Sequence, residues 1–151
     1  MTIGPFRRIL VGWDCSQGAT AALHAAAALA DSQDAHVVAL AVLGPAPQTE
    51  DTAEGAADLG GRQRFARETF AEARNSLPGS QQDQVTLQFA ESGDAARAVR
   101  EYARQNEFDV LVIGRHGTGG VLHPRLGRVA SAAMKDGHLT VLLVPQDPAL
   151  Y

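Results

Sequence analysis

The sequence predicts an α/β protein in which a parallel sheet has helices on both faces. Short apolar runs typical of buried strands alternate with longer segments whose apolar residues have helical spacing, and the alternation contains five strands. His36–Leu43 is apolar almost without a break, which favours a strand covered on both sides. Because crossovers between parallel strands of one sheet are right-handed, we expect helices on both faces.

In the amino-terminal half, residues 9–13 predict the first strand and the alanine-rich residues 17–30 the helix after it. After the second strand, residues 44–61 hold prolines and glycines without regular apolar spacing and predict a flexible connection. Residues 62–77 predict a helix that Pro78 and Gly79 end. The residues expected on its buried side are Phe65, Thr69, Phe70 and Ala73.

In the carboxyl-terminal half, apolar residues alternate with polar ones over residues 84–90, which predicts a strand near an edge of the sheet. Ser92 and Asp94 are capping residues in front of a helix over residues 95–105, and residues 108–113 predict the fourth strand. Residues 127–134 predict the last helix and Thr140–Val144 the last strand. We expect one domain over residues 1–151.

Composition excludes several classes of protein. The net charge of -4 and the pI near 5.7 disfavour a general binder of nucleic acid or of anionic membranes. No apolar run approaches the roughly 20 residues of a membrane helix, and no export signal is recognisable at the start. Cys15 is the single cysteine, which excludes an internal disulfide and fits a reducing compartment, so we expect a cytoplasmic location.

The predicted fourth strand leads into a glycine-rich segment, residues 114–120, and Gly127 follows shortly before the last helix. Glycines let backbone N–H groups approach an anion closely, and a helix start adds free N–H donors, so this segment is a candidate phosphate cradle. An ordinary surface loop with positive φ angles is the alternative. Asp14 follows the first strand, and ligands in such folds bind beyond the carboxyl ends of the strands, so Asp14 and Gly114 are expected to line one crevice.

The glycine spacing resembles that of the universal stress protein family. In its adenine-nucleotide-binding branch, a glycine, two residues, a glycine and nine residues precede a glycine followed by serine or threonine. Gly114, Gly117 and Gly127 match this spacing, residues 9–16 resemble the family's first strand and Asp-x-Ser turn, and residues 140–145 resemble its closing strand. Over about residues 8–145, the resemblance implies a Rossmann-like domain of the adenine nucleotide alpha hydrolase type, with strand order 3-2-1-4-5.

The resemblance also implies a site for ATP, alone or with Mg²⁺. Asp14 and the backbone near Gly12 and Val42 would hold adenosine, and backbone amides of the glycine-rich segment would hold the phosphates. The full set of expected binding residues is Gly12, Trp13, Asp14, Val42, Gly114, Arg115, Gly117, Gly127, Arg128 and Val129.

Arg128 departs from the family pattern, since it stands where the binding branch has serine or threonine. The backbone amide is kept but the hydroxyl is lost. A guanidinium with several N–H donors could grip a phosphate from this position, and its bulk could equally fill the cradle. Both alternatives stay open on the sequence.

Several candidates have a plain structural interpretation as well. Asp14 could cap the helix that follows it, Trp13 could be a core residue or a pocket wall, and Cys15 could be a small packed residue. His116 and His123 could touch phosphate or a divalent ion, but histidines in loops are usually only solvated.

The sequence favours a binding protein over an enzyme. Phosphoryl transfer needs a positioned lysine and metal-holding carboxylates, whereas the only lysine is Lys135 and no carboxylate lies between Gly114 and Gly127. We therefore expect at most slow, incidental ATP hydrolysis.

The expected function is that of an ATP-binding stress-response regulator, with residues 44–61 as the part that becomes ordered and an unidentified protein as a partner. The family pairs subunits through its last strand, which here is Thr140–Val144, an apolar strand that would otherwise be an exposed edge. The alternative is a nucleotide-independent dimeric interaction module in which Arg128 closes the pocket.

Overall fold

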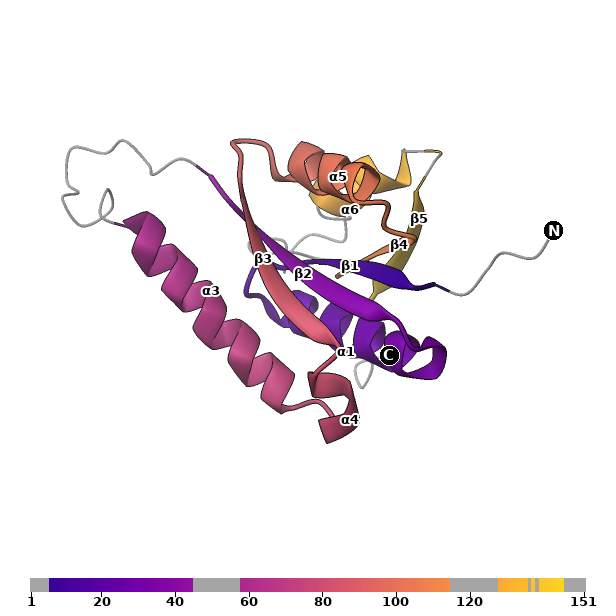
Figure 1. Cartoon of the computed structure of the whole chain (residues 1–151). Helices are drawn as coiled ribbons and strands as arrows, with labels where there is room; N and C mark the ends of the chain where they lie inside the picture. Colours follow the sequence, from indigo (N-terminus) through magenta and orange to yellow (C-terminus); the bar gives the residue numbers. More distant parts are fainter. Residues whose placement is uncertain (1–5, 45–57, 115–127, 136, 138, 146–151) are drawn as a thin grey trace.

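A computed structural model describes residues 6–44, 58–114, 128–135, 137 and 139–145 of the chain. These residues form a five-stranded sheet with the order β3-β2-β1-β4-β5, and every neighbouring pair is parallel (Figure 1). The predicted fold class and strand order are confirmed. The strands are β1 (Arg8–Gly12), β2 (His36–Leu43), β3 (Val85–Glu91), β4 (Val110–Gly114) and β5 (Thr140–Val144).

Helices cover both faces of the sheet, as the alternation of elements predicts. One core contains residues of α1 and α3, and the second core, on the opposite face, contains residues of α5 and α6 (Figure 1). The helices are α1 (Gln17–Gln33), α3 (Asp58–Asn75), α4 (Gly79–Gln82), α5 (Ala95–Gln105) and α6 (Arg128–Met134). None of these described helices combines the length and the hydropathy that a membrane-crossing segment needs.

The alternation of side chains along β1 separates the two cores. Ile9 and Val11 point to the face of α1 and α3, whereas Leu10 packs on the face of α5 and α6, and all three are fully buried. On α1, Ala22 and Ala26 recur at helical spacing and are also fully buried. Because alanine has a short side chain, α1 lies close to the sheet, and this brings its first turn next to the strand ends.

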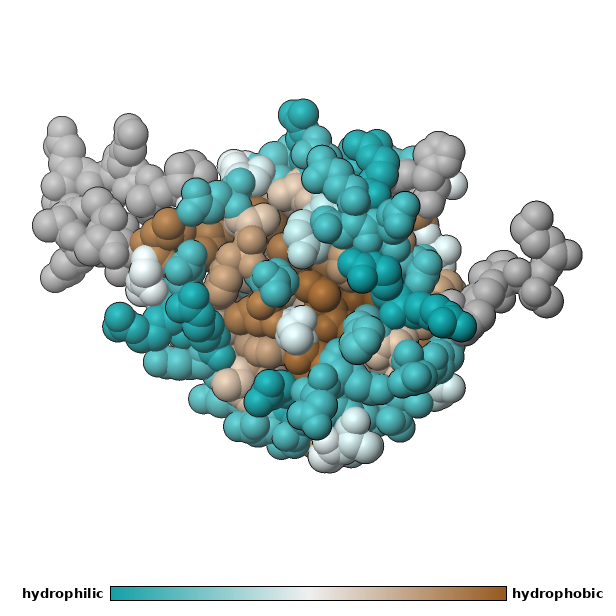
Figure 2. Space-filling view, viewed as in Figure 1, coloured by the Kyte–Doolittle hydropathy of each residue, from teal (hydrophilic) through white to brown (hydrophobic). Residues whose placement is uncertain are grey.

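The outer part of the sheet is less well covered on the α5 side. Val38 and Val42 of β2 are only half-buried, and so is Ala90 of β3, although all three pack against the core on that face. Figure 2 shows a hydrophobic patch ringed by hydrophilic residues on the side where β2 and β3 are in front. The alternating pattern of β3 agrees with its position, since β3 is an edge strand.

Two expectations for the segment before β3 are wrong. Helix α3 begins at Asp58, so residues 58–61 are helical and do not belong to the connection. Leu59 in this added first turn is 37% exposed, and the first buried residue of the helix is Ala66. Helix α3 also ends at Asn75, two residues earlier than expected, and a short helix, α4, follows with Pro78 as its N-cap.

Phe65 is the third correction. Its side chain is 58% exposed, whereas Ala66, Phe70 and Ala73 are buried. These three residues have spacings of four and three, so they form one stripe along the helix, and Phe65 is turned about 100° away from Ala66. Helical geometry therefore leaves Phe65 outside the core despite its hydrophobicity.

Candidate functional site

The carboxyl ends of β1 and β4 lie side by side at the centre of the sheet. The two strands pair in parallel, with Leu10 opposite Leu111 and Val11 opposite Val112. The segment after β1, which contains Asp14, and the end of β4 at Gly114 therefore reach the same edge of the sheet. Residues far apart in the sequence share this edge, as the sequence predicts.

Asp14 organises the turn between β1 and α1. Its Oδ1 accepts hydrogen bonds from the backbone N–H of Ser16, at 3.0 Å, and from the Ser16 hydroxyl. Ser16 is itself the N-cap of α1, because its Oγ accepts a hydrogen bond from the N–H of Ala19 at 3.1 Å. Asp14 is thus not the cap of α1. Its exposed side chain instead holds Ser16, which is the cap.

The turn also contains an unusual backbone conformation. Cys15 has a φ angle of 67°, in the left-handed region that non-glycine residues adopt rarely. The hydrogen bonds between Asp14 and Ser16 span Cys15 and hold this conformation. The sequence interpretation of Cys15 as a small packed residue agrees with its half-buried contact with the α1-side core.

Gly114 packs directly against the first turn of α1. A Cβ atom on Gly114 would lie only 2.8 Å from both the carbonyl carbon and the carbonyl oxygen of Gly18. Non-bonded Cβ contacts this short essentially never occur, so β4 and α1 approach this closely only because residue 114 is a glycine. The contact gives Gly114 a structural role that needs no ligand, and it adds Gly18, which the sequence interpretation did not include, to the residues that shape the edge.

This contact brings the amino end of α1 to the carboxyl end of β4. The first turn of a helix has N–H groups without intrahelical partners and carries partial positive charge. No acidic residue lies within the first turn of α1, but the Asp14 carboxylate stands just before the N-cap Ser16 and offsets part of that charge. The start of α1 still presents N–H donors to an anion beside the glycine-rich segment that follows β4.

The other described candidates near this edge are half-buried or buried. Gly12 is half-buried, and a Cβ there would lie 3.1 Å from Cγ2 of Ile113. Trp13 is 3% exposed and packs edge-to-face on Phe70 of α3, with ring centroids 5.7 Å apart, so it is a core residue. Val42 is half-buried on the α5 side near the end of β2.

Arg128 and Val129 are the first two residues of α6. The Arg128 side chain is exposed, whereas Val129 is half-buried against the core under α5. Arg115, Gly117 and Gly127 lie outside the described residues, as do His116 and His123. Among the residues that are described, no group of three or more His, Cys, Asp or Glu side chains could hold a metal ion.

The model of the universal stress protein family matches residues 5–145. The chain belongs to this family. A search of curated protein sequences finds no match. Among solved structures, this universal stress protein is similar to UspA from Lactobacillus plantarum, with 22% identity and a TM-score of 0.80 over 93% of this chain and 99% of that one.

Two further similar structures are described with a bound nucleotide. A universal stress protein in complex with cAMP is 18% identical, with a TM-score of 0.69 over 95% of this chain and 100% of that one. The universal stress protein from Archaeoglobus fulgidus in complex with dAMP is 17% identical, with a TM-score of 0.61 over 93% of this chain and 99% of that one. At these identities the similarity establishes the shared fold.

Proposed function

We propose that this universal stress protein binds ATP at the carboxyl edge of β1 and β4 and acts as a dimeric stress-response regulator. The observation that carries the proposal is the contact between Gly114 and Gly18, which puts the start of α1 beside the strand that leads into the glycine-rich segment. The family supports an adenine nucleotide as the ligand, since two similar structures are described in complex with cAMP and dAMP.

In this proposal, Asp14 recognises the adenosine part of the nucleotide from the turn that it stabilises. The amides of the glycine-rich segment and the start of α1 surround the phosphates, and Mg²⁺ offsets part of the phosphate charge when it is present. Binding regulates only if one conformation of the protein binds nucleotide more tightly than another. The output is then a change of conformation or of protein partner rather than a chemical product.

The proposal does not include efficient catalysis. The chain's only lysine, Lys135, follows the end of α6 and has an exposed side chain, so it does not resemble the buried, phosphate-facing lysine of a phosphotransfer enzyme. Nucleotide would therefore leave the site largely unchanged. A cytoplasmic location is part of the same proposal, because the ligand is a cytoplasmic metabolite.

The direct test is calorimetric titration of the purified protein with ATP and Mg²⁺, together with heat denaturation and chromatography of any small molecule that is released. The proposal predicts either a co-purified adenine nucleotide or a saturable ATP signal. Absence of both at millimolar ATP would reject it and leave the nucleotide-independent interaction module, with the pocket closed by Arg128.

Replacing Arg128 by serine tests what this residue does. Its side chain is exposed at the first residue of α6, which favours a donor to phosphate over a plug of the pocket. We expect Arg128→Ser to weaken ATP binding about tenfold, the loss of one charge-assisted contact. Arg74→Ser, an exposed arginine in the last turn of α3, is the control and should leave the affinity unchanged. Tighter binding by Arg128→Ser would show that Arg128 obstructs the site.

The dimer is proposed to form through β5. This strand pairs only with β4 among the described strands, and Leu142 is 40% exposed on it. A lysine on an edge strand opposes pairing with another strand. We expect Leu142→Lys to convert the dimer into a monomer in sedimentation velocity, while Thr86→Lys on β3, the other edge strand, leaves it dimeric. A monomeric parent protein, or a dimer that survives Leu142→Lys, would contradict this interface.

A further inference from the structure

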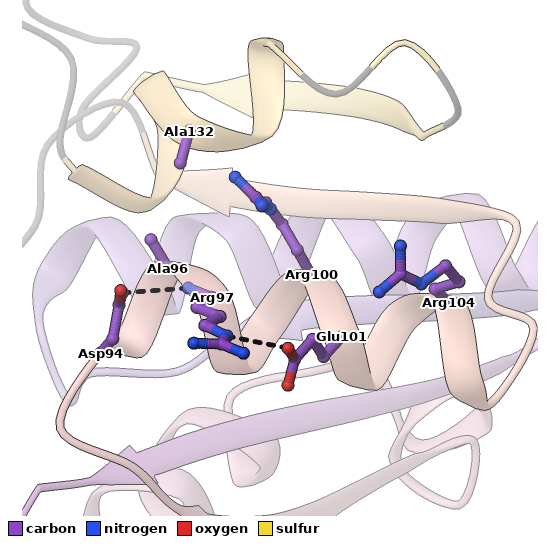
Figure 3. Close-up of a pocket in the computed structure, with 7 residues that line it drawn as sticks. All are labelled: Asp94, Ala96, Arg97, Arg100, Glu101, Arg104 and Ala132. Carbon is purple, nitrogen blue, oxygen red and sulfur yellow. Dashed lines mark hydrogen bonds and ion pairs between the residues drawn. The ribbon is translucent and has the colours of Figure 1, made fainter.

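A concave site lies between α5 and α6, on the face of the sheet opposite α1. It is a surface pocket of about 260 Å³ that follows α5 from its N-cap to its last turn (Figure 3). None of the predicted nucleotide-binding residues that the structure describes lines it. The lining residues are Asp94, Ala96, Arg97, Arg100, Glu101, Arg104 and Ala132.

Three arginines contribute to this pocket from one helix. Arg97, Arg100 and Arg104 are three and four residues apart, so they lie along one side of α5. A cluster of cations is notable in a chain whose net charge is -4. Like charges at this spacing repel each other, so the cluster lowers helix stability unless something compensates it.

The two carboxylates in the pocket are already engaged. Asp94 caps α5, because its Oδ1 accepts a hydrogen bond from the N–H of Arg97 at 3.1 Å. Glu101 pairs with Nε of Arg97 at 2.9 Å, and this contact raises the pKa of Arg97 above its usual value. Neither carboxylate has a contact with Arg100 or Arg104 in the described part of the chain.

Of the two arginines that these carboxylates leave unpaired, Arg104 is exposed and Arg100 is half-buried. Its Nε is shielded from solvent and has no hydrogen-bond partner among the described residues. Figure 3 shows the side chain extending from α5 toward Ala132 of α6, across the pocket. The unpaired Nε makes this position of the guanidinium unfavourable by itself, and the terminal N–H groups of the same guanidinium, which are not among the shielded atoms, would donate to an acceptor that a ligand supplies in the pocket.

We propose that the α5–α6 pocket binds a small phosphate-bearing anion, with Arg100 as its central contact. The planar guanidinium of arginine presents paired N–H donors that match phosphate oxygens. The volume of about 260 Å³ lies just below the range of about 300–1,000 Å³ usual for sites that enclose drug-sized ligands, which favours a small anion over a large one. No described candidate for nucleotide binding lines this pocket, and the proposal does not depend on ATP binding.

The test is an NMR titration of the nucleotide-free, ¹⁵N-labelled protein with inorganic phosphate. We expect saturable shifts of the backbone amide signals of α5 and of the end of α6, with a dissociation constant of about 1–10 mM. Shifts confined to the segment of Asp14 and Gly18 would instead report phosphate binding at the proposed nucleotide site. Residue-resolved signals therefore separate failure of this proposal from failure of ATP binding.

Three variants sharpen the result. Arg100→Met keeps an unbranched, flexible side chain but removes the guanidinium, and it should weaken the α5 and α6 response at least about tenfold. Arg100→Lys keeps the charge without the planar guanidinium, and its phosphate affinity should lie between those of the parent protein and Arg100→Met. Arg74→Met, on α3, is the matched control and should respond like the parent protein.

Thermal unfolding without phosphate distinguishes binding from a purely structural role. Because Arg100→Met removes an unpaired Nε, we expect its midpoint to equal or exceed that of the parent protein. A lower midpoint together with an unchanged phosphate response would show that Arg100 only packs between the helices and would overturn the proposal. No response of α5 or α6 up to about 20 mM phosphate would overturn it as well.

A comparison of anions identifies the source of the phosphoryl group. If glycerol phosphate binds more tightly than inorganic phosphate, the ligand is a small phosphate monoester. If both bind equally, the site takes free phosphate. Each of these results supports a phosphate-bearing anion at Arg100.

Discussion

Gly114→Ala is expected to lower the free energy of unfolding by about 2–3 kcal/mol, close to the upper range for overpacking a well-packed interior. The added Cβ would meet the backbone of Gly18 at 2.8 Å, and backbone atoms cannot move aside as the end of a flexible side chain does. Either β4 or the first turn of α1 must shift. Urea denaturation followed by circular dichroism measures the loss.

The control for this substitution is Gly79→Ala. Nothing lies within 4 Å of a Cβ built on Gly79, so this change should alter stability by less than about 0.5 kcal/mol. If Gly114→Ala were as stable as the control, the close contact of β4 with α1 would be wrong. ATP binding by Gly114→Ala should also fall, because the same contact places the start of α1 at the proposed site.

Gly117→Val is expected to abolish ATP binding, with a loss of at least about 100-fold, and to leave the domain folded. Gly117 lies outside the described residues, so the reason comes from its place in the glycine spacing, three residues after the end of β4. In a phosphate cradle the backbone N–H groups must come close to the anion, and a β-branched side chain prevents that approach.

Calorimetric titration with ATP measures the loss, and thermal unfolding confirms that the variant keeps its fold. Gly79→Val is the matched control, since it places the same side chain where a Cβ has no neighbour within 4 Å. Unchanged affinity of Gly117→Val would remove the glycine-rich segment from the site. Unfolding of Gly117→Val would instead assign Gly117 a packing role like that of Gly114.

Local patterns account for the parts of the fold that were predicted well. His36–Leu43, Ala95–Gln105 and Thr140–Val144 occur with the predicted bounds, because apolar runs, helical spacing and capping residues are properties of neighbouring residues. Asp94 shows this best: it was expected to cap α5 and does so through its own side chain. Apolar runs also placed Asp14 shortly after β1 and Gly114 at the end of β4.

Errors arose where two signals competed. Glycines and an irregular pattern predicted a connection up to residue 61, whereas residues 58–61 form the start of α3 although Leu59 and Gly60 are exposed, because extending an existing helix costs less than starting one. The hydrophobicity of Phe65 suggested burial, but its position around the helix axis leaves it exposed. Tertiary packing overrides a local preference when the preference is worth only a fraction of the packing energy.

By itself, the sequence determined the fold class, the order of the elements, the family through the spacing of Gly114, Gly117 and Gly127, and the edge of the sheet where a ligand is expected. Only the tertiary structure decided that Gly114 must be glycine because Gly18 lies against it, and that Arg100 extends between α5 and α6 without a partner for its Nε among the described residues. Contacts of this kind join segments that are distant along the chain. They depend on how closely helices pack on the sheet and on each other, and no periodic pattern of neighbouring residues encodes that distance.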